Sequence, residues 1–324
     1  MDLKSSGLSR PFGRAVVTGG AGFIGSHLCE ALVNANTEVI CVDNFCTGSP
    51  EAVAHLQDHP LFSLVRQDVS DKLTIDGPVD LVLHFASPAS PPQYAALPLE
   101  TLRVGSAGTF NALQLARTRK ARFVMASTSE IYGDPLQHPQ REDYWGNVNP
   151  VGPRSMYDEA KRFAEASTVA FGKTEGVDVG IVRIFNTYGP RLRSYDGRAV
   201  PNFIRQALAG ESLTVMGTGE QTRSLCYVDD LVRGVLAMAS SDCRGPINIG
   251  NPYEISVREL ALRIIEITGS RSLLRYVDGA DEDPKRRCPD ISLAERELGW
   301  FPTIDLGEGL RRTIEWFSSN VSVL

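Results

Sequence analysis

The chain has 324 residues, of which 42% are hydrophobic and 22% charged, and its formal net charge at pH 7 is -6. These values are ordinary for a folded enzyme, and the length suffices for one large domain or two interlocked ones. The negative net charge argues against a protein that binds nucleic acids or membrane surfaces in general, because binding to either needs a basic face. An anionic ligand must therefore be bound by individual arginines.

Residues 14–25 predict a short apolar strand that runs into a glycine-rich turn and then a helix. Gly19 can adopt a backbone conformation closed to other residues, Gly22 leaves room for a pyrophosphate, and Gly25 lets the helix lie close to the strand. The phosphates then meet the helix N-terminus, where unpaired N–H groups and the helix dipole favour negative charge. A dinucleotide site is therefore favoured over a glycine-rich turn without a ligand.

Residues 39–43 predict a second strand that ends in Asp43. Its carboxylate would accept hydrogen bonds from a ribose 2′-OH and repel a 2′-phosphate, which favours NAD over NADP. The alternative is a solvated residue at a strand end. A third strand, residues 62–69, contains Asp68, which we expect to reach the adenine.

Residues 80–87 predict a fourth strand whose near-continuous apolar run suits a strand covered on both faces. Four prolines in residues 88–98 then indicate a loop at its carboxyl end, where ligands bind in open α/β sheets. A following helix is expected to carry on one apolar side Leu99, Leu102, Ala112, Leu113 and Ala116.

Residues 122–126 predict the fifth strand, residues 155–173 a helix and residues 177–184 the sixth strand. This alternation indicates an α/β fold with a Rossmann-type doubly wound parallel sheet and a smaller C-terminal substrate domain. We expect residues 1–190 to form the cofactor-binding domain, with residues 225–250 returning to it, and residues 191–324 to form the substrate domain.

Tyr157 and Lys161 lie four residues apart, hence on one face of the predicted helix. A Lys cation and an oxidised nicotinamide both favour the phenolate, so Tyr157 could take a proton from a substrate hydroxyl as hydride leaves. Such a pair alone usually consists of surface residues without a catalytic role. Here it accompanies the glycine-rich turn, which favours the catalytic interpretation. Thr128, at the end of strand five, is placed to hydrogen-bond the same hydroxyl, whereas Ser127 is interpreted as structural.

The six cysteines are dispersed and form no Cys-x-x-Cys pair, which favours a reduced, cytoplasmic setting over disulfides or a thiolate metal site. His55 and His59 lack an obvious third ligand, so a surface pair is favoured over zinc. Residues 1–12 have no apolar core and no window is continuously apolar for ~18 residues, so neither secretion nor a membrane anchor is expected.

These motifs together resemble the extended short-chain dehydrogenase/reductase family that acts on nucleotide sugars. The resemblance covers nearly the whole chain and rests on residues 18–25, residues 43–45, Ser127-Thr128 and Tyr157-x-x-x-Lys161. Within the family, residues 86–92, 127–135, 142–150 and 183–191 resemble the branch that decarboxylates UDP-glucuronate. The resemblance implies conversion of UDP-glucuronate to UDP-xylose through a 4-keto intermediate, with NAD recycled and no metal.

The resemblance also implies roles for individual residues. Ser129 and Glu130 stand where sugar 4,6-dehydratases carry Asp-Glu, so the acid expected for eliminating a C6 hydroxyl is missing. Arg223 resembles an arginine near the sugar carboxylate, and Asn186 and Arg287 resemble ligands of the nucleotide diphosphate. The expected catalytic residues are Thr128, Glu130, Tyr157, Lys161 and Arg223; the cofactor-binding residues Gly19, Gly22, Phe23, Ile24, Gly25, Asp43, Asn44, Asp68, Val69, Tyr157 and Lys161; and the substrate-binding residues Ser129, Asn186, Arg191, Arg223 and Arg287.

Several alternatives remain open. Cys46 and residues 224–227 depart from the family pattern. The alternative role for Glu130 is a carboxylate that anchors a helix or loop. The alternative for Arg223 is a surface salt bridge, and the alternative for Arg287 is a place in a solvated basic run. A nucleotide-sugar 4-epimerase, acting on UDP-glucuronate or UDP-glucose, or a 4,6-dehydratase would share the fold and first step. A non-enzymatic NAD-sensing module would have no use for Thr128, Tyr157 and Lys161 together. The resemblance and the apolar faces of residues 99–116 and 157–171 predict a homodimer with a four-helix interface.

Overall fold

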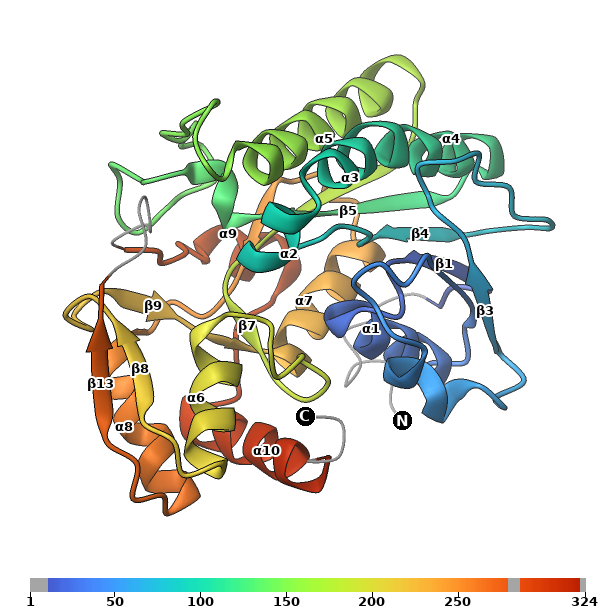
Figure 1. Cartoon of the computed structure of the whole chain (residues 1–324). Helices are drawn as coiled ribbons and strands as arrows, with labels where there is room; N and C mark the ends of the chain where they lie inside the picture. The colour runs from blue at the N-terminus through green and yellow to red at the C-terminus, as the bar shows by residue number, and fades with distance from the viewer. Residues whose placement is uncertain (1–10, 279–285, 321–324) are drawn as a thin grey trace.

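The structure is a computed structural model that describes residues 11–278 and 286–320. Most of the amino-terminal segment that is expected to lack a secretion signal lies outside the described residues. Figure 1 shows a layered α/β body with a second group of elements below one edge of its sheet.

A seven-stranded parallel sheet forms the centre of the molecule, with strand order β11-β6-β5-β4-β1-β2-β3. The prediction of a Rossmann-type doubly wound sheet is thus confirmed. Because all seven strands run the same way, the residues that follow them gather at one edge. The strands are β1 (Arg14–Thr18), β2 (Glu38–Asp43), β3 (Phe62–Arg66), β4 (Leu81–His84), β5 (Arg122–Thr128), β6 (Val179–Ile184) and β11 (Ile247–Ile249).

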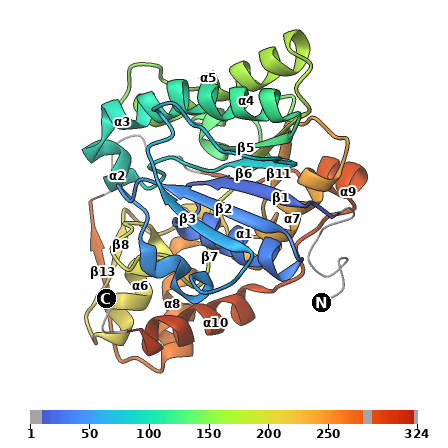
Figure 2. The same ribbon diagram turned by 90° about the vertical axis from the view of Figure 1, so that its right-hand side faces the viewer.

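Helices cover both faces of this sheet, as Figure 2 shows. Alternation along β1 sends Val16 to one face and Val17 to the other, and both are fully buried. The face with Val16 is covered by α3 (Pro98–Arg103), the π-helical turn η3 (Val104–Gly108), α4 (Thr109–Arg119) and α5 (Ser155–Thr174). The opposite face is covered by α1 (Phe23–Asn34) and α7 (Val228–Ser240).

The prediction of a loop over residues 88–98 is wrong in part, because two short helices form there. Ser90 precedes α2 (Pro91–Ala96), whose first two positions are prolines, and α3 begins at Pro98. Proline lacks an N–H group, but the first turn of a helix leaves its N–H groups unpaired in any case. These prolines therefore start helices instead of excluding them.

The prediction of one apolar side for the helix after residue 98 is also wrong in part. Ala112, Leu113 and Ala116 are fully buried, but Leu99 is 75% exposed and Leu102 is 41% exposed. The π-helical turn η3 lies between the two groups, and its wider turn rotates the later residues relative to the earlier ones. The two groups consequently do not share one face.

A smaller lobe lies beside the carboxyl edge of the sheet. Its helices α6 (Ala199–Leu208), α8 (Val257–Thr268) and α10 (Leu306–Ser319) pack on one another, and β8 (Leu213–Met216) pairs with β13 (Leu274–Val277). Strand β9 (Thr222–Ser224) pairs with β12 (Glu254–Ser256), and β7 (Thr187–Tyr188) with β10 (Cys226–Tyr227). Three further elements pack on the large body. Helix α9 (Ser292–Leu298) lies near β11, and the short 3-10 helices η2 (Pro50–Leu56) and η4 (Ser129–Tyr132) contact α1 and α5, respectively.

The chain crosses between these parts more than once. Helix α7 and β11 lie in the large body, and β11 pairs with β6, although both follow lobe elements in sequence. The division into two domains at residue 190 stays a prediction. Among the described residues, no helix is long and apolar enough to cross a membrane.

Candidate active site

A cavity of about 1370 Å³ lies between the carboxyl edge of the sheet and the lobe. Pockets for single small ligands are typically about 300–1,000 Å³, so this space exceeds the needs of one such ligand. Gly22 and Asp43 line one part of it, Tyr157 and Lys161 another, and Arg223 and Arg287 a third. The cavity therefore brings the predicted cofactor, catalytic and substrate residues to one place.

The glycine-rich turn between β1 and α1 is built so that side chains could not fit. Gly19 has φ +69°, and a Cβ atom on Gly25 would lie 2.1 Å from the Gly19 carbonyl oxygen. Gly22 precedes α1 and offers no side chain to its first N–H groups, and the first turn carries no acidic residue. These features leave the helix N-terminus open to an anion such as a pyrophosphate. Phe23 and Ile24 line the same part of the cavity.

Asp43 is held at the carboxyl end of β2 by backbone donors. Its Oδ2 accepts from the Ala21 N–H at 3.0 Å and its Oδ1 from the Phe45 N–H at 2.8 Å. Burial raises the pKa of this carboxyl. A carboxylate in this position, bordering the cavity, fits a ribose diol and disfavours a 2′-phosphate.

Asn44 and Asp68 continue the cofactor side of the cavity. The Asn44 side-chain amide donates to Asp68 at 3.1 Å, and Asp68 also accepts from the Ser70 N–H at 2.8 Å. Val69, which follows Asp68, is buried and also lines the cavity. The residues present thus fit NAD from the pyrophosphate to the adenosine end.

Tyr157 and Lys161 lie on the first turns of α5 and are both buried. The Lys161 ammonium is 5.8 Å from the centre of the Tyr157 ring and donates to the Ala126 carbonyl of β5 at 3.0 Å. Thr128, the last residue of β5, interacts with the Tyr157 hydroxyl and accepts from the Glu130 N–H at 3.3 Å. The predicted proton-handling residues are therefore adjacent.

The charges around Tyr157 decide its protonation. Burial, followed by the nearby Glu130 carboxylate, raises the pKa of the Tyr157 phenol, while its hydrogen bond with Thr128 lowers it. Burial lowers the pKa of Lys161 to about 8. Burial and the Glu130 charge thus favour the neutral phenol, and a further positive charge beside the ring would favour the phenolate.

Glu130 forms the centre of an ion-pair cluster at the substrate end of the cavity. Its carboxylate pairs with both Arg287 and Arg154, and Arg287 Nη2 donates to Glu130 Oε2 at 2.7 Å. Burial would raise the pKa of Glu130, but the two guanidinium groups hold it below its usual value. Arg287 thus lies buried beside the predicted catalytic residue Glu130 and not in a solvated basic run.

The other predicted substrate residues lie along the cavity but differ in their partners. Ser129 and Asn186 line it near Thr128, and Arg223 lines it from β9, where its Nη1 donates to the Thr222 carbonyl at 2.8 Å. Arg191 also borders the cavity, yet its guanidinium pairs with Glu30 of α1. The substrate contacts of all four residues stay predictions.

Ser127 has the structural contact that its interpretation requires. Its hydroxyl donates to Glu165 at 2.6 Å, and Glu165 pairs in turn with Arg183 of β6. This network joins β5, β6 and α5 below the cavity.

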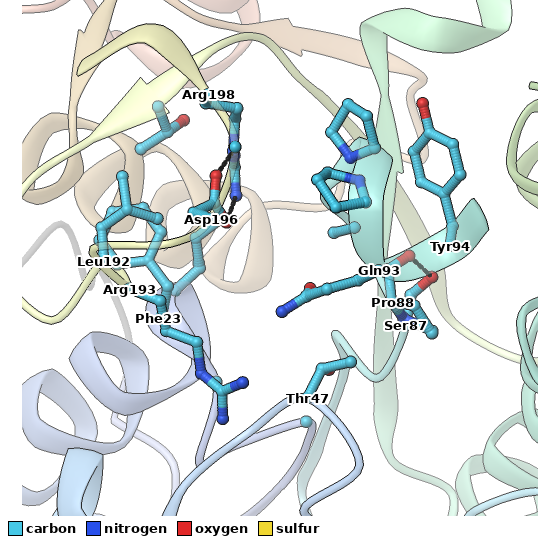
Figure 3. A pocket seen from close by; sticks show the side chains of 18 of the residues that line it. Phe23, Thr47, Ser87, Pro88, Gln93, Tyr94, Leu192, Arg193, Asp196 and Arg198 are labelled. Atoms are coloured by element: carbon cyan, nitrogen blue, oxygen red, sulfur yellow. Dashed lines mark hydrogen bonds and ion pairs between the residues drawn. The ribbon is translucent and has the colours of Figure 1, made fainter. Parts of the chain in front are cut away.

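Sequence reasoning missed several cavity residues that Figure 3 shows from close by. Tyr94 of α2 stacks on Tyr157 with ring centroids 5.0 Å apart and an interplanar angle of 11°. On the opposite side, Arg193 donates to the Gly48 carbonyl at 2.8 Å, and Arg198 pairs with Asp196. No spacing signal marks these residues, because segments distant in sequence bring them to the cavity.

Three comparisons place these features among known proteins. A model described as the NAD dependent epimerase/dehydratase family matches residues 15–250. UDP-glucuronic acid decarboxylase 1 of Danio rerio is 50% identical over 94% of this chain and 72% of its own length. UDP-glucuronic acid decarboxylase 3 of Arabidopsis thaliana is 47% identical over 99% of this chain and 94% of its own length.

Solved structures agree on the fold. The UDP-glucuronic acid 4-epimerase of Bacillus cereus, in complex with UDP-glucuronic acid and NAD, matches with a TM-score of 0.85 and 29% identity, covering 95% of this chain and 99% of the epimerase. A decarboxylase and an epimerase thus both resemble this chain, but the decarboxylases share far more of its sequence.

Proposed function

This chain belongs to the NAD dependent epimerase/dehydratase family, and on that premise we propose that it decarboxylates UDP-glucuronate to UDP-xylose through a 4-keto intermediate. The observation that carries the proposal is the roughly 50% identity to UDP-glucuronic acid decarboxylases over nearly the whole chain. The site supplies the groups that this reaction needs, within one cavity.

When bound, NAD would supply the hydride acceptor and donor for C4 of the sugar, and Gly22, Asp43, Tyr157 and Lys161 would hold it in the cavity. The Tyr157 phenolate then takes the proton of the C4 hydroxyl, and Thr128 hydrogen-bonds the same oxygen. Lys161 stays oriented by its bond to the Ala126 carbonyl and favours the phenolate by its charge. These roles are proposals for residues whose adjacency the structure provides.

Decarboxylation follows from the oxidised sugar. With a ketone at C4, the carboxylate on C5 belongs to a β-keto acid, whose loss of CO₂ leaves an enolate spread onto the C4 oxygen. Thr128 and Tyr157 hydrogen-bond that oxygen where negative charge develops. Protonation at C5 and reduction at C4 then give the UDP-pentose. NAD is regenerated in each cycle.

An arginine must hold the sugar carboxylate before it leaves. Arg223 is our candidate from sequence, and it borders the cavity on β9. Arg287 also borders the cavity, where it pairs with Glu130, and its charge acts on Tyr94. We propose that both contribute, with Arg223 as the residue whose loss impairs turnover more than NAD binding.

The competing functions are distinguished by particular residues. Ser129 replaces the acid that a 4,6-dehydratase needs to eliminate the C6 hydroxyl. A 4-epimerase shares the first oxidation, and the Bacillus cereus structure contains UDP-glucuronic acid, but it is 29% identical to this chain. The decarboxylase is therefore the proposal, with UDP-glucuronate 4-epimerase as the alternative.

We also propose that two copies of the chain pair through α3, α4 and α5, which lie side by side in Figure 1. Five large apolar side chains on these helices are exposed, and Phe110 stacks on Phe163 with centroids 6.0 Å apart. A four-helix interface would cover this surface, and sedimentation that shows only monomer at micromolar concentration would refute it. The five are Leu99, Leu102, Phe110, Phe163 and Val169.

We further propose that the protein is cytoplasmic. We also propose a boundary near residue 190 between an NAD-binding domain and a nucleotide-sugar-binding domain.

The proposed function is tested by incubating the enzyme with a panel of nucleotide sugars and identifying the products by mass. We expect turnover of UDP-glucuronate without NADH accumulating in proportion to product. Stoichiometric NADH would contradict the recycling of the cofactor.

A further inference from the structure

His138, Glu254 and Cys288 converge on one point outside the cavity. They come from the loop after η4, from the start of β12 and from the segment that follows Arg287. Each residue offers one ligating atom, and these three atoms lie within 4.8 Å of one another. They are a His nitrogen, a carboxylate oxygen and the Cys sulfur. His138 Nε2 lies 2.9 Å from Glu254 Oε2.

This donor set has the chemistry of a zinc site. Zn²⁺ binds neutral His nitrogen, Cys thiolate and carboxylate oxygen, and three protein ligands with one water form a common arrangement. Tetrahedral ligands at zinc bond lengths lie about 3.3–3.8 Å apart. His138 and Glu254 are exposed at one side of the cluster, so their side chains can adjust toward those separations.

Electrostatics around Cys288 favours a cation. The carboxylates of Glu254 and Asp290 both act electrostatically on Cys288. These two carboxylates attract a divalent ion, and a bound ion displaces the thiol proton. The positive charge next to the site, Arg287, is directed away from it toward Glu130.

The surrounding hydrogen bonds hold the ligands in place. The Cys288 backbone N–H donates to Gln140 Oε1 at 2.8 Å, and its carbonyl accepts from the Gln140 N–H at 2.8 Å. The Thr222 hydroxyl donates to the second oxygen of Glu254. Metal-binding carboxylates are commonly held by such a second hydrogen bond.

We propose that His138, Glu254 and Cys288 bind one Zn²⁺ ion, which ties the loop after η4 and β12 to the segment that carries Arg287. The spacing of the cysteines in sequence does not indicate this site, because its nearest two ligands, Glu254 and Cys288, are 34 positions apart and meet only in the folded chain. The site is separate from the sugar chemistry and does not depend on the proposed reaction.

The test titrates Zn²⁺ into the full-length, metal-stripped protein by calorimetry. Cys46 is exposed and offers a competing thiol, so the reference protein carries Cys46→Ser. We expect one Zn²⁺ per chain in the reference, and at least about 100-fold weaker binding after adding Cys288→Ser or His138→Ala. Zn²⁺ should also raise the melting temperature of the reference and not of these variants, because it binds the folded chain.

Two further measurements keep the result unambiguous if a variant folds poorly. Co²⁺ should give a thiolate charge-transfer band in the reference that Glu254→Gln weakens and Cys288→Ser abolishes, with NAD binding as the check on folding. Thr222→Val should weaken Zn²⁺ binding by about 10-fold, as loss of a supporting hydrogen bond does. Absence of Zn²⁺ binding, or affinity unchanged by Cys288→Ser, would overturn the proposal and leave His138–Glu254 as an ion pair alone.

Discussion

The ring of Tyr94 lies flat against the ring of Tyr157, with centroids 5.0 Å apart and planes 11° from parallel. Tyr94 is buried on α2, and among the described residues its hydroxyl has no hydrogen-bond partner. Stacking of this kind contributes about 0.5–1.5 kcal/mol beyond area burial. The flat face of Tyr94, and not its hydroxyl, therefore positions the phenol of Tyr157.

Two substitutions of Tyr94 separate the effect of its ring from the effect of its hydroxyl. Tyr94→Phe keeps the stacked ring and should leave turnover near that of the wild type. Tyr94→Leu keeps an apolar side chain without the flat face and should lower kcat by roughly 2–10-fold, the equivalent of the lost stacking energy. Steady-state kinetics of both variants test this; equal losses in the two would assign the effect to the hydroxyl instead.

Tyr157→Phe should abolish turnover while NAD still binds, because it removes only the phenol oxygen that takes the C4 proton. Loss of such a base lowers rates by about 10²–10⁴-fold. Tyr94→Phe is the matched control, since it deletes the other hydroxyl of the same stacked pair. Activity retained in Tyr157→Phe would mean that another group is the base.

Asp43→Ala should weaken NAD binding by about 1.5–3 kcal/mol, the value of hydrogen bonds to a charged acceptor. Asp43→Asn keeps one side-chain acceptor for the Ala21 or Phe45 N–H, so it should cost less. It should also shift the ratio of NAD to NADP affinity toward NADP, since the anion that repels a 2′-phosphate is gone. Calorimetry with both cofactors measures this, and an unchanged ratio would remove Asp43 from the ribose site.

Asp158, next to Tyr157, should make stability depend on pH. Burial, and then the charge of Glu130, raise its pKa to about 7, and its Oδ1 lacks a partner among the described residues. The unfolded value is about 3.9, so between these pH values the folded chain holds a proton that the unfolded chain has lost. This contribution to stability is present at low pH and is lost as pH rises toward about 7.

Asp158→Asn removes this titration and should therefore gain stability relative to the wild type as pH rises from about 4 to 7, on the order of 1 kcal/mol per pH unit across the window. Melting temperatures measured at several pH values test it. Glu159→Gln, which neutralises the adjacent carboxylate, is the control for net charge. Parallel curves for the wild type and Asp158→Asn would contradict the prediction.

The sequence predicts the sheet well because its strands are short apolar runs with clear ends, such as β4. The glycine-rich turn, Asp43 and the Tyr157–Lys161 pair carry local spacing signals that survive in the structure. Prolines misled the prediction over residues 88–98, since proline at a helix start favours the helix that α2 and α3 form.

The remaining features depend on packing between distant segments. Arg287 reaches Glu130 across 157 positions in the chain, and Tyr94 reaches Tyr157 only because α2 lies beside α5. The π-helical turn η3, which turns Leu99 outward, has no local signal that we recognise. Such contacts follow from the whole fold and not from periodicity.

The central claim concerns which bond of the sugar breaks, and UDP-glucuronate labelled at C6 tests it most directly. A decarboxylase releases the label as CO₂ and leaves unlabelled UDP-xylose, because the C5 carboxylate is lost from the 4-keto sugar. We predict this result for the wild-type protein. UDP-galacturonate with its label retained would show that the chain is a 4-epimerase and would contradict the account.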